Sequence, residues 1–147
     1  LNGGAGDDYL IGGFGDGAGD TLTGGGGNDK FVLDGHSSAL HVPAGGTDII
    51  TDFDVSGTDS LFVDVADQAL TIGTAQTISN GQFTWSGATG GTENDASAWS
   101  ESGSADKFFF NAGTHDLWYS ANGTGNDKID LAHMATGVPV AADVHTF

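Results

Sequence analysis

A tandem glycine-rich repeat near the start of the chain constrains its fold more than any other feature. Residues 3–11 read G-G-A-G-D-D-Y-L-I and residues 24–32 read G-G-G-G-N-D-K-F-V. Both match the nine-residue pattern G-G-x-G-x-D-x-U-x, in which U is a large apolar residue. Residues 12–23 are a third copy, with residues 16–18 as an insertion in its turn. A flexible linker has no reason to keep an apolar residue two places after each Asp, so the pattern predicts a folded array.

The chemistry of the pattern predicts turns lined with oxygen atoms. Glycine adopts backbone angles closed to other residues, so six residues can form a tight turn whose carbonyl groups point inward. The Asp adds a carboxylate, and x-U-x forms a short strand whose U residue (Leu10, Leu22 or Phe31) points into the core. Two repeats then make one coil of a parallel β-roll, and each turn lies above the turn two repeats later. Ca²⁺ takes six to eight flexible oxygen ligands, which suits the space between such turns, whereas Mg²⁺ is too strict in geometry.

This stacking predicts which aspartates share an ion. Asp8 and Asp29 fall on one edge of the roll, and Asp20 falls on the other. The segment Gly45-Gly46-Thr47-Asp48 is a contracted echo of the repeat, so Asp48 is expected to complete the site begun by Asp20, with a loop over residues 33–44 between them. The predicted calcium ligands are these four aspartates, Asp52, and the glycines Gly3, Gly4, Gly6, Gly12, Gly13, Gly15, Gly24, Gly25 and Gly27.

The charge of the chain also favours a cation as partner. Twenty acidic residues face three basic ones, and the formal net charge of −17 argues against nucleic acid or an anionic membrane as a partner. A salt-adapted surface would be expected to raise Glu, yet Glu93 and Glu101 are the only two. A disordered acidic tail is disfavoured by the ordinary apolar content of 37%. The chain has no Cys, so a secreted domain of this kind needs another means of stabilisation, of which bound metal is one, although the absence of Cys would equally suit a cytosolic protein.

These repeats resemble those of the RTX (repeat-in-toxin) family of bacterial proteins exported by type I secretion, which includes haemolysins, serralysin-type proteases, lipases, epimerases and adhesins. The resemblance implies a right-handed parallel β-roll and bound Ca²⁺. The array here is short, and the insertion at residues 16–18 departs from the family pattern. Leu1 and Asn2 fit the last two positions of a repeat, so we expect the sequence to begin inside a longer array.

The rest of the chain is predicted to be a β-strand cap. Residues 48–65 predict two strands around a turn at 56–58 and resemble the segment that follows the last repeat in serralysin-type proteins. Residues 82–85 alternate like a strand, and residues 106–120 predict two strands joined by a turn at 111–113. Residues 87–103 are a polar loop containing Trp99. The expected organisation is therefore all-β, with a roll over residues 1–35 and an antiparallel cap over residues 36–147.

The C-terminal residues 117–147 resemble the ends of RTX proteins, where the uncleaved tail is the type I export signal. They have an aromatic strand, a glycine-rich turn, an apolar strand and A-A-D followed by a few more residues. The resemblance implies that the tail contacts the type I secretion machinery. We also expect residues 141–147 to lie outside the roll.

No catalytic pattern is present in the sequence. Zincin and nucleophile-elbow motifs do not occur, and the absence of Cys excludes thiol chemistry. Asp52 and Asp54 could do acid–base work, but ligand or surface roles suit their Asp-rich context better. The aromatic residues could form a sugar-stacking platform, although core packing is the simpler role for Trp85 and Trp118. The histidines are scattered: His36, His41, His115, His133 and His145.

The sequence therefore predicts a secreted, extracellular bacterial module that is not itself an enzyme. Its function would be Ca²⁺ binding coupled to folding, together with carriage of an export signal. The alternative is an adhesive or self-assembling module, such as an adhesin end, a surface-layer piece or a filament subunit, with self-association or cell-surface contact.

Overall fold

The computed structural model describes residues 1–13, 19–34, 47–55, 57–64, 76–77, 83–86, 108–111, 113–119, 129–140 and 142–146. Strands make up 57% of this part of the chain and none of it is helical, which confirms the all-β prediction. The strands are β1 (Asn2–Ala5), β2 (Tyr9–Ile11), β3 (Thr21–Gly26), β4 (Lys30–Asp34), β5 (Asp48–Ile50), β6 (Ser60–Asp64), β7 (Gln76–Thr77), β8 (Phe83–Ser86), β9 (Phe108–Asn111), β10 (Asp116–Tyr119), β11 (Ile129–Met134) and β12 (Val144–Thr146). These residues contain no helix with the length and apolar character that a membrane span requires.

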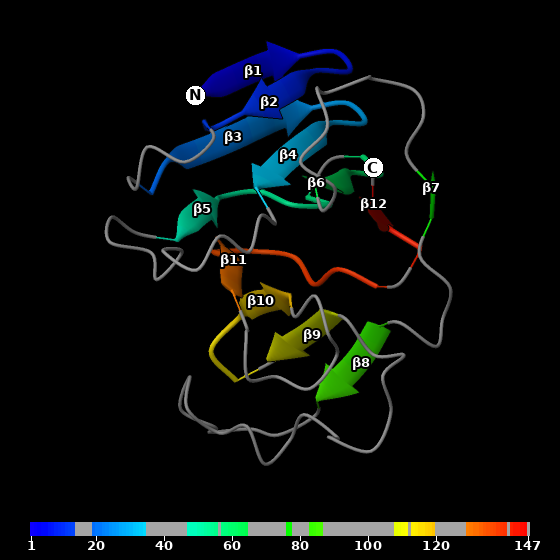
Figure 1. The fold of residues 1–147 in the computed structure, drawn as a ribbon. Helices are drawn as coiled ribbons and strands as arrows, with labels where there is room; N and C mark the ends of the chain where they lie inside the picture. The colour runs from blue at the N-terminus through cyan, green and yellow to red at the C-terminus, as the bar shows by residue number, and fades with distance from the viewer. Residues whose placement is uncertain are drawn as a thin grey trace.

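The strands form two sheets, and consecutive strands from β1 to β6 alternate between them (Figure 1). One sheet has the order β1-β3-β5-β11-β10-β9-β8, and the other has the order β2-β4-β6-β12-β7. Strands β1, β3, β5 and β11 pair in parallel, as do β2, β4, β6 and β12. Each strand–turn–strand segment therefore lies on the next one, with β1 and β2 at one end of the stack.

Two columns of apolar residues fill the space between the sheets. In one sheet Leu10 pairs with Phe31, Phe31 with Leu61, and Leu61 with Val144. In the other, Ile50 pairs with both Leu22 and Met134. All of these side chains are at most 3% exposed. The predicted U positions of the repeat are thus core positions, since one residue in each short strand must point inward.

The antiparallel cap is present only in part. Strands β9 and β10 pair antiparallel, as do β10 and β11, and β7 and β12. However, β8 pairs with β9 in parallel, and β11 and β12 each pair in parallel with a strand of the stack, β5 and β6 respectively, on their other side. The reason is the core: Met134 and Val144 are fully buried in the same columns as the repeat residues. Residues 142–146 therefore belong to the stack of the two sheets, in which β12 pairs with β6 and β7.

The local strand predictions fare better. Both strands expected in residues 48–65 exist, but they lie in different sheets, one on each side of the core. The hairpin expected in residues 106–120 is confirmed by β9 and β10, and Trp118 is 9% exposed, as core packing requires. The loop expected from residue 33 starts later, because Leu33 is buried and β4 continues to Asp34. Most of the predicted loops, Trp99 and the insertion at 16–18 lie outside the described residues.

Candidate metal sites in the stacked turns

The repeat glycines adopt the backbone angles that the pattern requires. Gly4 and Gly25 occupy the same repeat position and have φ values of 106° and 101°, while Gly6 and Gly27 have values of 109° and 139°. Residues with a Cβ rarely adopt these angles, so both turns need Gly at these places. Gly13, in the next repeat, has a φ of 147°. Gly15 lies outside the described residues.

Glycine also allows the turns to lie directly on one another. A Cβ added to Gly25 would collide with the carbonyl oxygen of Gly4, and a Cβ added to Gly27 would collide with that of Gly6. The amide of Gly6 donates a hydrogen bond of 2.7 Å to the carbonyl of Gly26. Carbonyl oxygens of turn 3–8 therefore face turn 24–29, as a site lined by backbone oxygens would need.

Asp8 and Asp29 lie together, in the predicted register. The Asp8 amide donates a hydrogen bond of 3.0 Å to Oδ1 of Asp29, which is 2% exposed. Oδ2 of Asp8 is buried and has no hydrogen-bond partner among the described residues. A Cβ added to Gly3 would lie 2.6 Å from this oxygen and 2.8 Å from the carbonyl oxygen of Gly24. Two oxygens from two turns thus converge on the place that the absent Gly3 side chain leaves open.

Asp20 and Asp48 also lie together, on the opposite edge. The Asp20 amide donates a hydrogen bond of 2.9 Å to Oδ1 of Asp48, and the Ile49 amide donates one of 2.7 Å to the Asp20 carbonyl. A Cβ added to Gly12 would lie 3.1 Å from Oδ2 of Asp48 and 3.2 Å from Oδ2 of Asp20. The structure therefore brings together each pair of aspartates that the repeat register predicts.

Asp52 binds a turn through both of its carboxylate oxygens. They accept amide hydrogen bonds of 2.9 Å from Gly24 and 2.8 Å from Gly25. The strand pairing explains this position, because Leu22 lies opposite Ile50 and the hydroxyls of the next residues, Thr23 and Thr51, lie 2.8 Å apart. Asp52 therefore lies beside the turn at residues 24–29, and its hydrogen bonds hold Gly24 and Gly25, the first two glycines of that repeat, in place.

Asp59 extends the column of Asp8 and Asp29, and sequence reasoning missed it. Its Oδ1 accepts a hydrogen bond of 2.9 Å from the Asp29 amide. Asp54 and Asp59 also accept hydrogen bonds from each other's amides, at 2.7 and 2.8 Å. The available signal was the order Gly57-Thr58-Asp59-Ser60-Leu61, a degenerate copy of G-x-D-x-U. The segment that carries Asp54 and Asp59 is thus the third turn of this edge. The reciprocal hydrogen bonds between Asp54 and Asp59 hold this turn together.

Carboxylates accumulate at this edge of the molecule. Burial raises the pKa of the Asp59 carboxyl, and the charges of Asp29 and Asp54 add to the rise, while amide hydrogen bonds from the same two residues oppose it. Burial also raises the pKa of Asp143, and the charges of Asp54 and Asp59 act in the same direction. The negative form of these groups is therefore disfavoured in the fold unless a cation compensates it.

A second side-chain column runs beside the first with its hydrogen bonds reversed. Oδ1 of Asp7 accepts a bond of 2.9 Å from the Asn28 amide, and Oδ1 of Asn28 accepts one of 2.9 Å from the Thr58 amide. In this column each side chain accepts from the following turn, whereas in the Asp8 column each accepts from the preceding turn. The two columns together fix the register of the turns.

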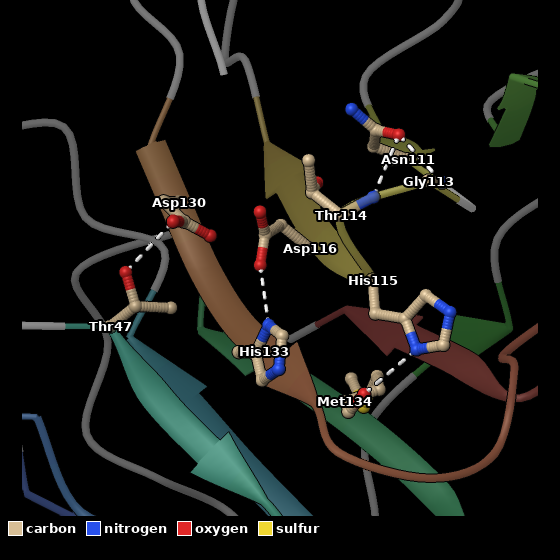
Figure 2. Close-up of polar contacts among 9 residues, drawn as sticks. All are labelled: Thr47, Asn111, Gly113, Thr114, His115, Asp116, Asp130, His133 and Met134. Carbon is tan, nitrogen blue, oxygen red and sulfur yellow. Dashed lines mark hydrogen bonds and ion pairs between the residues drawn. The ribbon is translucent and has the colours of Figure 1, made fainter. Parts of the chain in front are cut away.

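The described histidines have structural partners on the sheets. His133 on β11 lies 2.8 Å from Asp116 on β10, and Nδ1 of His115 lies 3.3 Å from the carbonyl of Met134 (Figure 2). His145 stacks on Phe62, and burial lowers its pKa. His36 and His41 lie outside the described residues. Within the described ranges, no group of three or more His, Asp or Glu side chains is arranged to hold a metal ion.

Comparisons with protein-family models, curated proteins and solved structures gave no match.

Proposed function

We propose that this chain is a calcium-binding module of a secreted protein similar to the RTX family, in which Ca²⁺ binding drives folding. The observation that carries the proposal is the convergence of Asp8 Oδ2 and the Gly24 carbonyl beside Gly3, with Asp29 directly below. A buried carboxylate oxygen with no hydrogen-bond partner is costly unless something positive lies nearby. Hard oxygen ligands without nitrogen or sulfur suit Ca²⁺.

The strand order supports a parallel β-roll as the finer description of the fold. Consecutive strands from β1 to β6 alternate between the parallel parts of the two sheets, and turn 3–8 lies on turn 24–29, two repeats away. Crossovers between parallel strands are right-handed in nearly all proteins, so a right-handed roll is the expected hand. In this arrangement backbone carbonyl oxygens of one turn face the adjacent turn, where they could serve as ligands for a cation.

The available donors fit calcium in two places. Asp8 and Asp29 would hold one ion with carbonyls of residues 3–6 and 24–27, and Asp20 and Asp48 would hold another. Each place offers two carboxylates, so carbonyl oxygens and water must supply most of the six to eight ligands. This division of ligands is consistent with the finding that no cluster of three acidic or histidine side chains occurs in the described residues.

Calcium would act by compensating the repulsion among the carboxylates. At a net charge of −17 the compact state repels itself, and a bound divalent ion removes part of that cost. Extracellular modules bind Ca²⁺ with Kd values of about 10⁻⁴ to 10⁻³ M. A site filled at about 100 times its Kd contributes about 2.7 kcal/mol, so two sites rival the whole stability of a small domain.

The decisive experiment compares two neighbouring aspartates by calcium titration. Asp8→Asn removes a charge from the proposed site, whereas Asp7→Asn removes one from the same turn but keeps the oxygen that accepts from Asn28. Isothermal titration should show calcium affinity at least about tenfold weaker for Asp8→Asn, a change of about 1.4 kcal/mol, and little change for Asp7→Asn. Equal effects of the two substitutions would assign the binding to diffuse charge and overturn the site.

We propose further that the C-terminal residues carry a type I export signal, as the resemblance of residues 117–147 implies. Because β12 is part of the stack, any change to residues 141–147 also affects folding, so the test needs a control variant that weakens folding and keeps the tail. Scrambling the order of residues 141–147 should abolish export by a type I system, whereas Asp29→Asn, which weakens folding alone, should leave export unchanged. Normal export of the scrambled chain, or loss of export in both variants, would contradict the assignment.

A self-assembling extracellular module is the second candidate. The observation in its favour is that β1 and β2 are the first strands of their sheets, and no described strand pairs with their outer edges. Size-exclusion chromatography with and without calcium separates the candidates, since calcium-dependent oligomers favour assembly and a calcium-dependent compact monomer favours the folding module.

A further inference from the structure

Asp52 follows β5 at a place that the strand pairing fixes closely. Strand β3 lies between β1 and β5 in its sheet (Figure 1), and Leu22 of β3 lies opposite Ile50 of β5. The Thr51 amide donates a hydrogen bond of 3.0 Å to the Leu22 carbonyl, and the Thr51 hydroxyl lies 2.8 Å from that of Thr23. The residue after Thr51 is therefore held beside the residues that follow Thr23, on the β5 side of β3.

The carboxylate of Asp52 holds one side of the peptide group between Gly24 and Gly25. Its Oδ2 accepts a hydrogen bond of 2.8 Å from the Gly25 amide, and its Oδ1 accepts one of 2.9 Å from the Gly24 amide. The Gly25 N–H and the Gly24 C=O belong to one planar, trans peptide group, so they point in opposite directions. With the N–H held toward β5, the Gly24 carbonyl points toward β1.

The Gly24 carbonyl points to the proposed calcium site. Its oxygen would lie 2.8 Å from a Cβ added to Gly3 of β1, and Oδ2 of Asp8 would lie 2.6 Å from the same Cβ. This Asp8 oxygen is buried and has no hydrogen-bond partner among the described residues. One of the two oxygens that converge there is therefore directed by Asp52 through a single peptide group.

A peptide group between two glycines needs such an anchor. Neither Gly24 nor Gly25 has a Cβ to restrict its backbone angles, so this carbonyl could turn away from the site at little steric cost. A ligand that is oriented before the ion arrives loses less conformational entropy on binding. The negative charge on the N–H side also polarises the peptide group, which increases the negative charge on the Gly24 oxygen.

We propose that Asp52 is a positioning residue for the calcium site of Asp8 and Asp29, which directs and polarises the Gly24 carbonyl without binding the ion itself. The sequence predicts a direct ligand role for Asp52, but both of its oxygens accept from amides on the side of the peptide group that faces away from the site. Residues that orient metal ligands commonly affect metal affinity about tenfold or more. The inference rests on the proposed calcium function and extends that site by one layer.

The test measures calcium affinity at each proposed site separately. Asp20→Asn removes a ligand of one site and leaves the Asp8 site, and Asp8→Asn does the reverse. Asp52→Asn is then added to each variant; it removes the charge and replaces one acceptor oxygen by an amide nitrogen that cannot accept. Isothermal titration should show calcium affinity about tenfold weaker in the Asp20→Asn background and nearly unchanged in the Asp8→Asn background. A purely structural role would weaken both sites alike, and that result would overturn the proposal.

The matched control is Asp54→Asn in the Asp20→Asn background. It removes the same charge two residues away, keeps an oxygen that accepts from the Asp59 amide, and places Asn at a φ of 55°, which Asn adopts readily. It should leave calcium affinity nearly unchanged. An effect as large as that of Asp52→Asn would assign the loss to general charge and would also overturn the proposal.

A crystal structure of the wild-type chain with calcium tests the geometry without requiring any variant to fold. The Gly24 carbonyl oxygen should lie about 2.3–2.6 Å from the ion, with both Asp52 oxygens still on the glycine amides. An Asp52 oxygen among the ligands, or a Gly24 carbonyl turned away from the ion, would overturn the inference and leave the proposed function standing. Absence of calcium binding by the wild-type chain would overturn both.

Discussion

At the scale of single residues, the turns are set by glycines whose absent side chains make room for oxygen atoms. Gly3 and Gly12 lie beside carboxylates, and Gly25 and Gly27 lie beneath carbonyls. Gly3 and Gly12 serve a close approach, whereas Gly25 and Gly27 combine a close approach with a positive φ angle. These two requirements differ in how a substitution would act, because at a positive φ angle it strains the backbone and at a close approach it displaces a neighbour.

Gly25→Ala should destabilise the fold strongly. The new Cβ would meet the Gly4 carbonyl, and the φ of 101° would be strained for Ala, so we expect a loss of about 2 kcal/mol or more. The control is Gly26→Ala, because the paired position in the first repeat already holds Ala5. Chemical denaturation in saturating calcium should give a lower midpoint for Gly25→Ala and nearly the wild-type midpoint for Gly26→Ala. Similar midpoints for the two variants would contradict the stacked-turn geometry.

Without calcium, mild acid should favour the fold. The pKa of Asp59 and that of Asp143 are raised in the folded state, so the folded chain binds protons that the unfolded chain has released. The stabilisation from these groups is therefore complete below their ordinary pKa of 3.8 and is lost as pH rises through the raised values. In EDTA, the β signal in circular dichroism should therefore grow as the pH is lowered from neutrality toward the ordinary pKa of 3.8.

The matched variant for this pH dependence is Asp59→Asn, which cannot ionise at that position. Its β signal in EDTA should change less over the same range. A wild-type signal that falls steadily as the pH is lowered would show that the buried carboxylates do not oppose folding.

At the scale of elements, the sequence predicted the parts governed by a short repeat and missed those governed by distant pairing. The register of Asp8 with Asp29 follows from nine-residue periodicity, because every residue in one turn has a marked counterpart in the other. The parallel pairing of β5 with β11 joins residues about eighty positions apart, and no local sequence pattern predicts it. Asp59 falls between these cases, since its turn keeps G-x-D but has lost the leading glycines.

Asp20 and Asp48 should behave as one unit. If they share an ion, Asp20→Asn and Asp48→Asn should each remove the same calcium-binding event, and the double variant should lose little more than either single variant. Isothermal titration of the four proteins measures the coupling. As a control, Asp20→Asn combined with Asp8→Asn, from the opposite edge, should be close to additive. Additive losses in the Asp20 and Asp48 pair would place the two carboxylates on different ions, or on none.

At the scale of the whole molecule, the question is what holds a glycine-rich chain with this charge in one compact form. The core is real, with two buried apolar columns and further buried aromatics at Phe53, Phe108 and Phe110. It must compensate the backbone entropy of 26 glycines and the repulsion of a net charge of −17. The turns carry most of the described carboxylates, so the balance depends on whether a cation fills them.

Removal of calcium should therefore expand the entire chain and leave no folded part. A folded domain of this length has a radius of gyration of about 15 Å, and an unfolded chain about 40 Å. Small-angle scattering should move from the larger value in EDTA to the smaller one in millimolar Ca²⁺, and circular dichroism should gain β signal over the same titration. Magnesium is the control ion, because its strict octahedral geometry suits carbonyl-rich turns poorly, and it should leave the chain expanded at equal ionic strength. A compact, β-rich chain in EDTA with no metal left in the sample would show that the apolar columns suffice alone, while equal compaction by magnesium would reduce the effect to charge screening.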